Sequence, residues 1–205
     1  MGLVIFMVMG VYLLISLGVV AGAVVYAQKH GKRAWLWALA AAFVMYNLVF
    51  WDWIPTVVAH RYYCEKEAGF WVYKTLEQWK AENPGVMETL PAQSKTGSPT
   101  KYEQFDDEYG ETTTFLLNER FNWVVTQQDT FRLLPIIRME QQVKDVKKNN
   151  VLARYVDFGT GNSVKNKVGP PGPLKFWLRN GHCNGGDRNS SLMWQFTEQF
   201  YGSKK

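Results

Sequence analysis

The sequence lacks the short motifs by which common enzyme classes are recognised. None of GxSxG, GxxxxGK[ST], GxGxxG, HExxH and CxxCH occurs in its 205 residues. The Gly-rich stretch 159–163 precedes no predicted helix, which argues against a phosphate-binding loop. The acidic run 106–108 lacks the spacing of a calcium-binding EF-hand loop. Catalytic chemistry is therefore not predicted from motifs, although distant residues could still meet in space.

Charge is almost absent from the first 58 residues, where only Lys29, Lys32, Arg33 and Asp52 are ionised at neutral pH. The other 147 residues hold 20 of the 23 basic and 17 of the 18 acidic side chains. A small positive excess of this size, without a basic run, does not predict nucleic-acid binding. The sequence thus divides into an apolar segment, 1–58, and a domain of ordinary polarity, 59–205.

Two long hydrophobic runs, 3–27 and 34–54, lie within the apolar segment. A membrane-spanning helix needs about 20 apolar residues, and both runs reach that length. The polar stretch 28–33 separates them, so we predict a transmembrane helical hairpin. A cleaved signal peptide over 1–27 is the alternative, because Ala21-Gly22-Ala23 resembles a cleavage site. The absence of early positive charge and the length of the run argue against it.

The positive charges of the hairpin turn predict its orientation. Lys29, Lys32 and Arg33 place the turn in the cytoplasm by the positive-inside rule. Both termini and the domain would then lie in the periplasm of a two-pass inner-membrane protein. We therefore expect the domain to fold in an oxidising compartment.

Small residues recur at four-residue spacing in both predicted spans. Gly18 and Gly22 form one row, and Ala34, Ala38 and Ala42 form the other. Small side chains let helix backbones approach closely. One interpretation is that the rows pack against each other within the hairpin, and the other is that one row contacts a helix of a partner protein.

Tryptophans flank Asp52 at the end of the second run. Trp51 and Trp53 are typical of the membrane–water interface, so we expect Asp52 to be an interfacial carboxylate. The alternative is a proton or ion pathway. A lone carboxylate with no partner in the other predicted helix makes a pathway a weak hypothesis.

The domain has the pattern of an α+β fold with an antiparallel sheet and flanking helices. We predict helices over 56–67 and 190–200 and a further one after Thr75, which with Gln78 fits a capping box. Loops are predicted over 91–101 and 159–173, and the structure of 102–111 is left open. Strands are predicted over the following ranges: 69–74, 112–125, 130–134, 136–146 and 151–158.

The two cysteines, Cys64 and Cys183, are the strongest candidate pair in the domain. In an oxidising compartment they predict a disulfide that closes a loop of over a hundred residues. The alternative is a metal site, because His60, Cys64, His182 and Cys183 offer the ligand types of zinc or copper. Their spacing matches no common zinc module, so no metal or other cofactor is predicted.

These observations favour a non-catalytic envelope protein that acts through protein–protein contacts. We expect an accessory or scaffold subunit of a larger inner-membrane assembly, bound to a partner membrane protein or to further copies of itself. An extracytoplasmic ligand-binding or sensing protein is the first alternative. A metal-dependent enzyme or electron carrier that uses His60, Cys64, His182 and Cys183 is the second.

Overall fold

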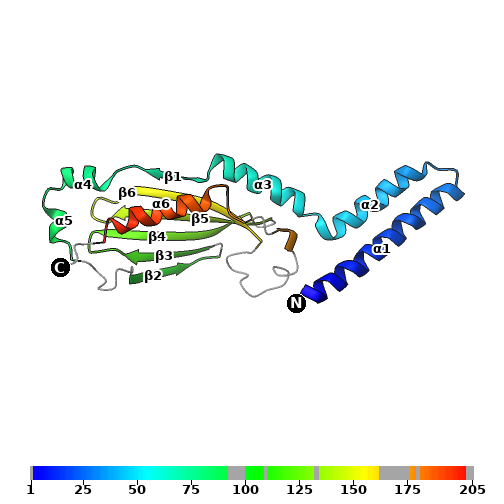
Figure 1. Ribbon diagram of the computed structural model, residues 1–205, viewed down its shortest axis with the longest axis horizontal. Coiled ribbons are helices and arrows are strands. Elements are labelled where there is room, and N and C mark those ends of the chain that lie inside the picture. Colours follow the sequence, from blue (N-terminus) through cyan, green and yellow to red (C-terminus); the bar gives the residue numbers. More distant parts are fainter. Residues whose placement is uncertain are drawn as a thin grey trace. The chain divides into compact units, whose positions relative to one another are not determined.

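The computed structural model describes residues 2–91, 100–108, 110–131, 134–161, 176–178 and 181–201. The chain divides into two compact units, Met1–Pro55 and Thr56–Lys205. Figure 1 shows a pair of helices in the first unit and a sheet with helices in the second. The two units are described separately below.

The first unit is a pair of antiparallel helices, α1 (Gly2–Lys29) and α2 (Ala34–Phe50), which lie side by side (Figure 1). The turn between them contains Gly31 at φ 62°, a backbone conformation that glycine adopts without steric cost. The Tyr12 hydroxyl donates a hydrogen bond from α1 to the Met45 carbonyl of α2. The aromatic rings of Tyr26 and Trp37 meet near the turn, with 5.5 Å between their centroids.

The second apolar run is not one continuous helix. The α2 helix ends at Phe50, a two-residue turn follows, and α3 (Trp53–Lys66) begins. The 28-residue α1 helix is long and apolar enough to cross a membrane. The α2 helix reaches that length only if it is counted with α3 as one broken span. The residues that the structure describes therefore contain one clear candidate span, and the predicted two-span hairpin is not confirmed.

The second unit contains a six-stranded antiparallel sheet in the order β1-β6-β5-β4-β3-β2. The strands are β1 (Gly69–Val72), β2 (Thr100–Asp106), β3 (Gly110–Leu116), β4 (Phe121–Phe131), β5 (Leu134–Asp145) and β6 (Asn150–Thr160). The predicted α+β class and antiparallel pairing are confirmed, whereas two strand boundaries are wrong. The range 112–125 belongs to β3 and β4, and 130–134 covers the end of β4 and the start of β5.

A buried asparagine explains why the predicted strand 112–125 is split. The Asn118 side-chain oxygen accepts hydrogen bonds from the backbone N–H groups of Arg120 and Phe121, at 2.8 and 3.0 Å. Its amide nitrogen donates to the Phe200 carbonyl at 2.7 Å. Asparagine side chains that bond the nearby backbone favour turns. The turn lets β3 and β4 pair instead of forming one long strand.

One face of the sheet packs against α6 (Gly186–Glu198), as Figure 1 shows. The Trp123 ring of β4 meets the Trp194 ring of α6, and Phe70 of β1 meets Phe196. Two short helices, α4 (Leu76–Glu82) and α5 (Val86–Thr89), add to this core. The capping box predicted at Thr75 and Gln78 is present at the start of α4. The buried residues of this core are Trp79, Met87, Leu90, Leu117, Phe121, Val143, Leu152, Ala153, Tyr155, Met193, Phe196 and Phe200.

A buried ion pair joins the ends of β4 and β5, and a tryptophan of α4 donates a hydrogen bond to it. The Arg120 guanidinium donates to both carboxylate oxygens of Asp145, at 2.7 and 3.0 Å, and the Trp79 indole N–H donates to one of them at 2.9 Å. The backbone N–H groups of Lys147 and Lys148 donate to the other oxygen. Burial opposes the charge of Asp145, but these hydrogen bonds outweigh it and hold its pKa below the ordinary value. The carboxylate is therefore fully satisfied where it is buried.

Candidate functional site

The α3 helix brings a histidine and a cysteine onto one of its faces. His60 and Cys64 are four residues apart, which places them one above the other on a helix. The Tyr63 ring stacks on the Phe158 ring of β6, with 5.1 Å between the centroids. This contact and the apolar side chains around it hold α3 against the end of β6.

A disulfide joins Cys64 to Cys183, with 5.4 Å between the two Cα atoms and 119 residues of sequence between them. The pairing predicted from the sequence is therefore present. The β1 strand pairs with β6 only as far as Val156, and the disulfide lies beside the part of β6 that follows. It clasps α3 to the segment that precedes α6.

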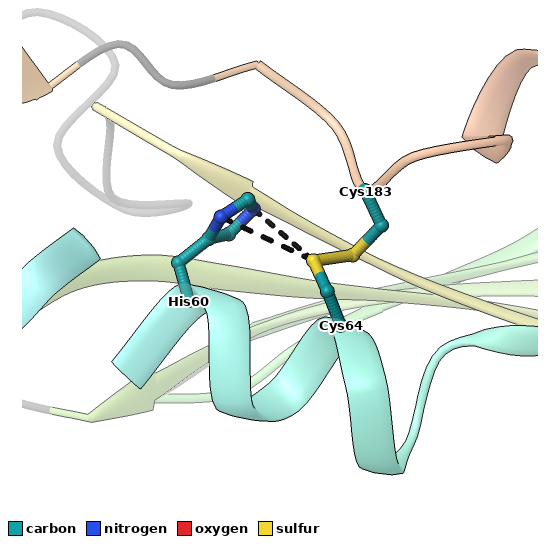
Figure 2. Close-up of side chains that lie close together, drawn as sticks. All are labelled: His60, Cys64 and Cys183. Carbon is teal, nitrogen blue, oxygen red and sulfur yellow. Dashed lines mark hydrogen bonds between the residues drawn. A yellow bond between two sulfur atoms is a disulfide. The ribbon is translucent and has the colours of Figure 1, made fainter. Parts of the chain in front are cut away.

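His60 lies directly beside this disulfide, as Figure 2 shows. Its side chain is 9% exposed, and its Nε2 atom lies 3.0 Å from the Phe158 carbonyl oxygen. A carbonyl oxygen only accepts hydrogen bonds, so this contact assigns the proton to Nε2 and leaves a lone pair on Nδ1. The Cys64 sulfur lies 3.5 Å from Nε2 and 4.0 Å from Nδ1. The imidazole and both sulfurs thus form one compact cluster.

Asp157 fixes the segment that carries Cys183. One of its carboxylate oxygens accepts a hydrogen bond from the Cys183 backbone N–H at 3.1 Å. The other lies 2.8 Å from Nδ1 of His182. The Tyr155 hydroxyl donates to the Gly186 carbonyl at 3.1 Å, and burial together with the charge of Asp157 raises the pKa of Tyr155. These contacts with residues of β6 fix the position of the segment that carries Cys183.

The structure brings together three of the four residues that sequence reasoning offered as metal ligands. His60, Cys64 and Cys183 have ligand atoms within 4.8 Å of one another. His182 is 53% exposed and bonds Asp157 instead. Asp157 was not identified from the sequence. Its signal was a single acidic residue between apolar neighbours in a predicted strand, a position where a buried carboxylate needs partners.

The glycine row of α1 lies outside the contact between α1 and α2. Apart from the backbone of its own helix, a Cβ atom built on Gly18 or Gly22 would meet no atom of the described residues within 4 Å. Ala42 is likewise exposed, whereas Ala34 and Ala38 are half-buried. The half-buried and buried positions of the pair are Ile5, Met9, Tyr12, Ser16, Val20, Ala23, Val24 and Ala27 in α1, with Ala34, Ala38, Ala41, Met45, Tyr46, Asn47, Val49 and Phe50 in α2. Packing of Gly18 and Gly22 against α2 is therefore not observed.

The residues expected at the membrane interface differ in exposure. Trp51 and Trp53 are exposed, whereas Asp52 is buried in the two-residue turn between α2 and α3. The carboxylate thus occupies the point where the second apolar run breaks. Its interfacial location stays a prediction.

Comparisons of this chain with models of protein families, with curated proteins and with solved structures found no match. Two features of the described residues bear on function: the His60–Cys64–Cys183 cluster and the exposed glycine row of α1. With its disulfide closed, the cluster cross-links α3 to the segment that precedes α6. The glycine row is an exposed helix surface that a partner could contact.

Proposed function

We propose that this protein is a membrane-anchored accessory subunit, which binds the helix of a partner membrane protein through the glycine row of α1. In this proposal α1 and the second apolar run, 34–54, form a two-pass anchor in an inner membrane, and the sheet domain, which includes most of α3, lies in the periplasm. The length and apolarity of α1 and the disulfide of the domain support this location.

The exposed glycine row carries the proposal. Gly18 and Gly22 have no side chain, and nothing in the described part of the chain lies within 4 Å of a Cβ built at either position. The α1 helix contacts α2 through a different set of positions, so the row is not needed for the helix pair. In a membrane, small residues at this spacing provide close backbone contact, which drives helix association where the hydrophobic effect is absent.

The most suitable occupant is an apolar helix of another integral membrane protein. The neighbours of the row, including Leu14, Val19 and Val25, are exposed and carry neither charge nor hydrogen-bonding groups. An apolar surface of this kind complements an apolar helix and offers nothing to a polar peptide. Association with a second copy of this chain is the other outcome that the experiment below detects.

Crosslinking in native membranes tests the proposal. We expect the full chain to form a crosslinked species with a partner helix, and Gly18→Leu and Gly22→Leu to reduce it several-fold because a bulky side chain separates the backbones. Gly10→Leu is the matched control, because Gly10 is equally open but lies outside the four-residue pair. A monomeric chain, or equal loss in all three variants, would contradict the proposal.

The proposed topology has an independent test. The turn holds Lys29, Lys32 and Arg33, and the Lys32 ammonium lies over the Trp37 ring, 4.9 Å from its centroid. A cationic turn of this kind favours the cytoplasmic side. A phosphatase reporter that is active only in the periplasm should be active when fused to the C-terminus. It should be inactive when inserted at Gly31, and the reverse result would overturn the orientation.

A further inference from the structure

We propose that the reduced form of this protein binds a thiophilic d10 metal ion, Zn²⁺ or Cu⁺, through Cys64, Cys183 and His60. The disulfide closes this site in the oxidised form. The inference does not depend on the accessory role proposed above, because it concerns residues of the sheet domain alone.

The ligand atoms are already close together. One ring nitrogen of His60 and the two sulfurs lie within 4.8 Å of one another (Figure 2). Zinc binds thiolate sulfur at about 2.3 Å in a tetrahedral arrangement, so two bound sulfurs are about 3.8 Å apart. Breaking the disulfide lets the sulfurs move apart, and the 5.4 Å between the Cα atoms leaves room for side-chain rotation. The ligands therefore need only small movements.

A hydrogen bond to the Phe158 carbonyl orients the His60 ring. Metal-binding histidines usually donate their other ring N–H to a carboxylate or a backbone carbonyl, which fixes the tautomer and aims the lone pair. In His60, Nε2 donates to the Phe158 carbonyl, so Nδ1 keeps its lone pair, and Nδ1 lies 4.0 Å from the Cys64 sulfur. The carbonyl belongs to β6, inside the sheet.

The charge of the reduced site favours a cation. A buried thiolate at Cys183 and a half-buried one at Cys64 are unfavourable without a counter-ion, and a divalent ion neutralises both. Asp157 lies on the same side, where it accepts the Cys183 N–H, and its negative charge further favours a cation. His182 is held by Asp157 and is not one of the ligands. Three protein ligands suit a trigonal Cu⁺ site or a Zn²⁺ site whose fourth position takes water.

The site opens by reduction of the disulfide, and a metal ion then binds. An external dithiol reduces the Cys64–Cys183 bond, giving two thiols in this chain and a disulfide in the reductant. A metal ion then binds both sulfurs and displaces their two protons, while neutral His60 donates its Nδ1 lone pair without losing a proton. Reoxidation transfers two electrons from the two thiolates to a disulfide of an external protein, which takes up two protons and becomes two thiols. The Cys64–Cys183 bond forms again and the ion is released.

Metal titration of the full chain in detergent tests the inference, with the phosphine-reduced and the oxidised protein compared under anaerobic conditions. We expect one Zn²⁺ or one Cu⁺ per reduced chain and none retained by the oxidised chain. Cd²⁺ should produce the near-ultraviolet absorption of thiolate–metal bonds in the reduced chain only. If reduction loosens the domain, as seen by near-ultraviolet circular dichroism, one ion per chain should restore the signal. Failure to bind, or to restore the signal, would overturn the inference.

Variants identify the ligands. His60→Ala should weaken binding by at least about ten-fold, as expected when a metal site loses a ligand or its support. His60→Gln can retain the hydrogen bond to Phe158 and should weaken binding as much, which separates ligation from folding. His30→Ala, at the turn of the helix pair, should leave the affinity unchanged. Equal binding in the His60 variants, or binding that survives Cys64→Ser, would contradict the site.

Discussion

The helix pair and the sheet domain bury apolar side chains to opposite extents. In Met1–Pro55, Ala27 is the one hydrophobic residue of the described part that is fully buried, and leucines such as Leu13 and Leu39 are about 60% exposed. In Thr56–Lys205, large side chains such as Trp79, Phe121 and Phe158 are almost wholly buried. The first unit thus exposes most of its apolar side chains, whereas the second encloses many of them in a core.

This difference determines what stabilises each unit. Burial of apolar surface drives folding in water at about 25 cal/mol per Å², but apolar surface gains nothing when it leaves lipid. In the membrane location proposed above, the helix pair relies on close contacts such as those of Tyr12 with Met45 and Phe50. The domain combines a packed core with buried polar bonds and one disulfide. The predictions below separate the two kinds of stability.

Loss of the disulfide should have the largest effect. The Cys64→Ala/Cys183→Ala variant should lower the free energy of unfolding of the domain by about 4 kcal/mol, because the cross-link restricts the unfolded chain over 119 residues. The helix pair should keep its far-ultraviolet circular dichroism. Urea unfolding in detergent, followed by tryptophan fluorescence, measures the difference. A loss below about 1 kcal/mol would show that the packing of Tyr63 on Phe158 holds α3 without the bond.

Removal of the buried carboxylate should have the next largest effect. Asp145→Ala should destabilise the domain by about 3–4 kcal/mol, because the Arg120 guanidinium would be left buried without its partner. Lys74 and Glu82 form an exposed ion pair, so Glu82→Ala is the control and should cost little. Equal losses in the two variants would contradict the assigned role of burial.

A matched pair of leucines tests the comparison directly. Leu152→Ala, at a position 1% exposed, should cost about 3 kcal/mol, because it leaves a cavity in the core. Leu39→Ala, at a position 60% exposed on α2, should change the stability of the helix pair by less than about 0.5 kcal/mol. Thermal unfolding of both variants in the same detergent provides the measurement. A large effect at Leu39 would mean that another helix covers this face.

Acid should weaken the domain and spare the helix pair. The folded-state pKa of Asp145 is lowered from 3.8, so its contribution to stability is present above that value and is lost as the pH falls through the lower, folded-state pKa. The loss should be smaller than in Asp145→Ala, because a protonated carboxyl keeps some hydrogen bonds. Urea midpoints between neutral and acidic pH measure it. The Asp145→Asn variant should lack this part of the pH dependence.

The smallest predicted effect lies at the start of α4. Thr75→Ala removes the hydroxyl that accepts the Gln78 N–H at 3.2 Å, and it should cost about 1 kcal/mol. Thr75→Ser should restore most of the loss, because serine offers the same oxygen. Urea unfolding distinguishes the two variants, and an unchanged midpoint in Thr75→Ala would mean that the cap contributes nothing.

Local patterns predicted the parts of this protein that depend on neighbouring residues. The apolar run 3–27 predicted α1, the capping box at Thr75 predicted the start of α4, and alternation over 151–158 predicted most of β6. Local patterns failed where residues distant in the sequence determine the start or end of a strand, or whether it forms. The boundary between β3 and β4 depends on Asn118, whose amide bonds the carbonyl of Phe200. The β2 strand, left unassigned over most of its length, exists because β3 pairs with it.

The candidate site shows the same division. The types and spacing of His60 and Cys64 were evident from the sequence, since a helix places residues four apart on one face. The exclusion of His182 from the cluster was not, because it follows from a contact with Asp157, 25 residues away along the chain. Likewise, small residues at four-residue spacing were visible as a row. Only the structure showed that Gly18 and Gly22 lie outside the contact with α2.

By itself, the sequence determined the apolar character of the first segment, the α+β class of the domain and the pair of cysteines able to join. These properties follow from composition and short-range periodicity, which act along the chain. The tertiary structure alone decided the break at Asp52, the order of the six strands and the hydrogen bond from His60 to Phe158. Each of these depends on groups that folding brings together from distant positions, where no local pattern records the choice.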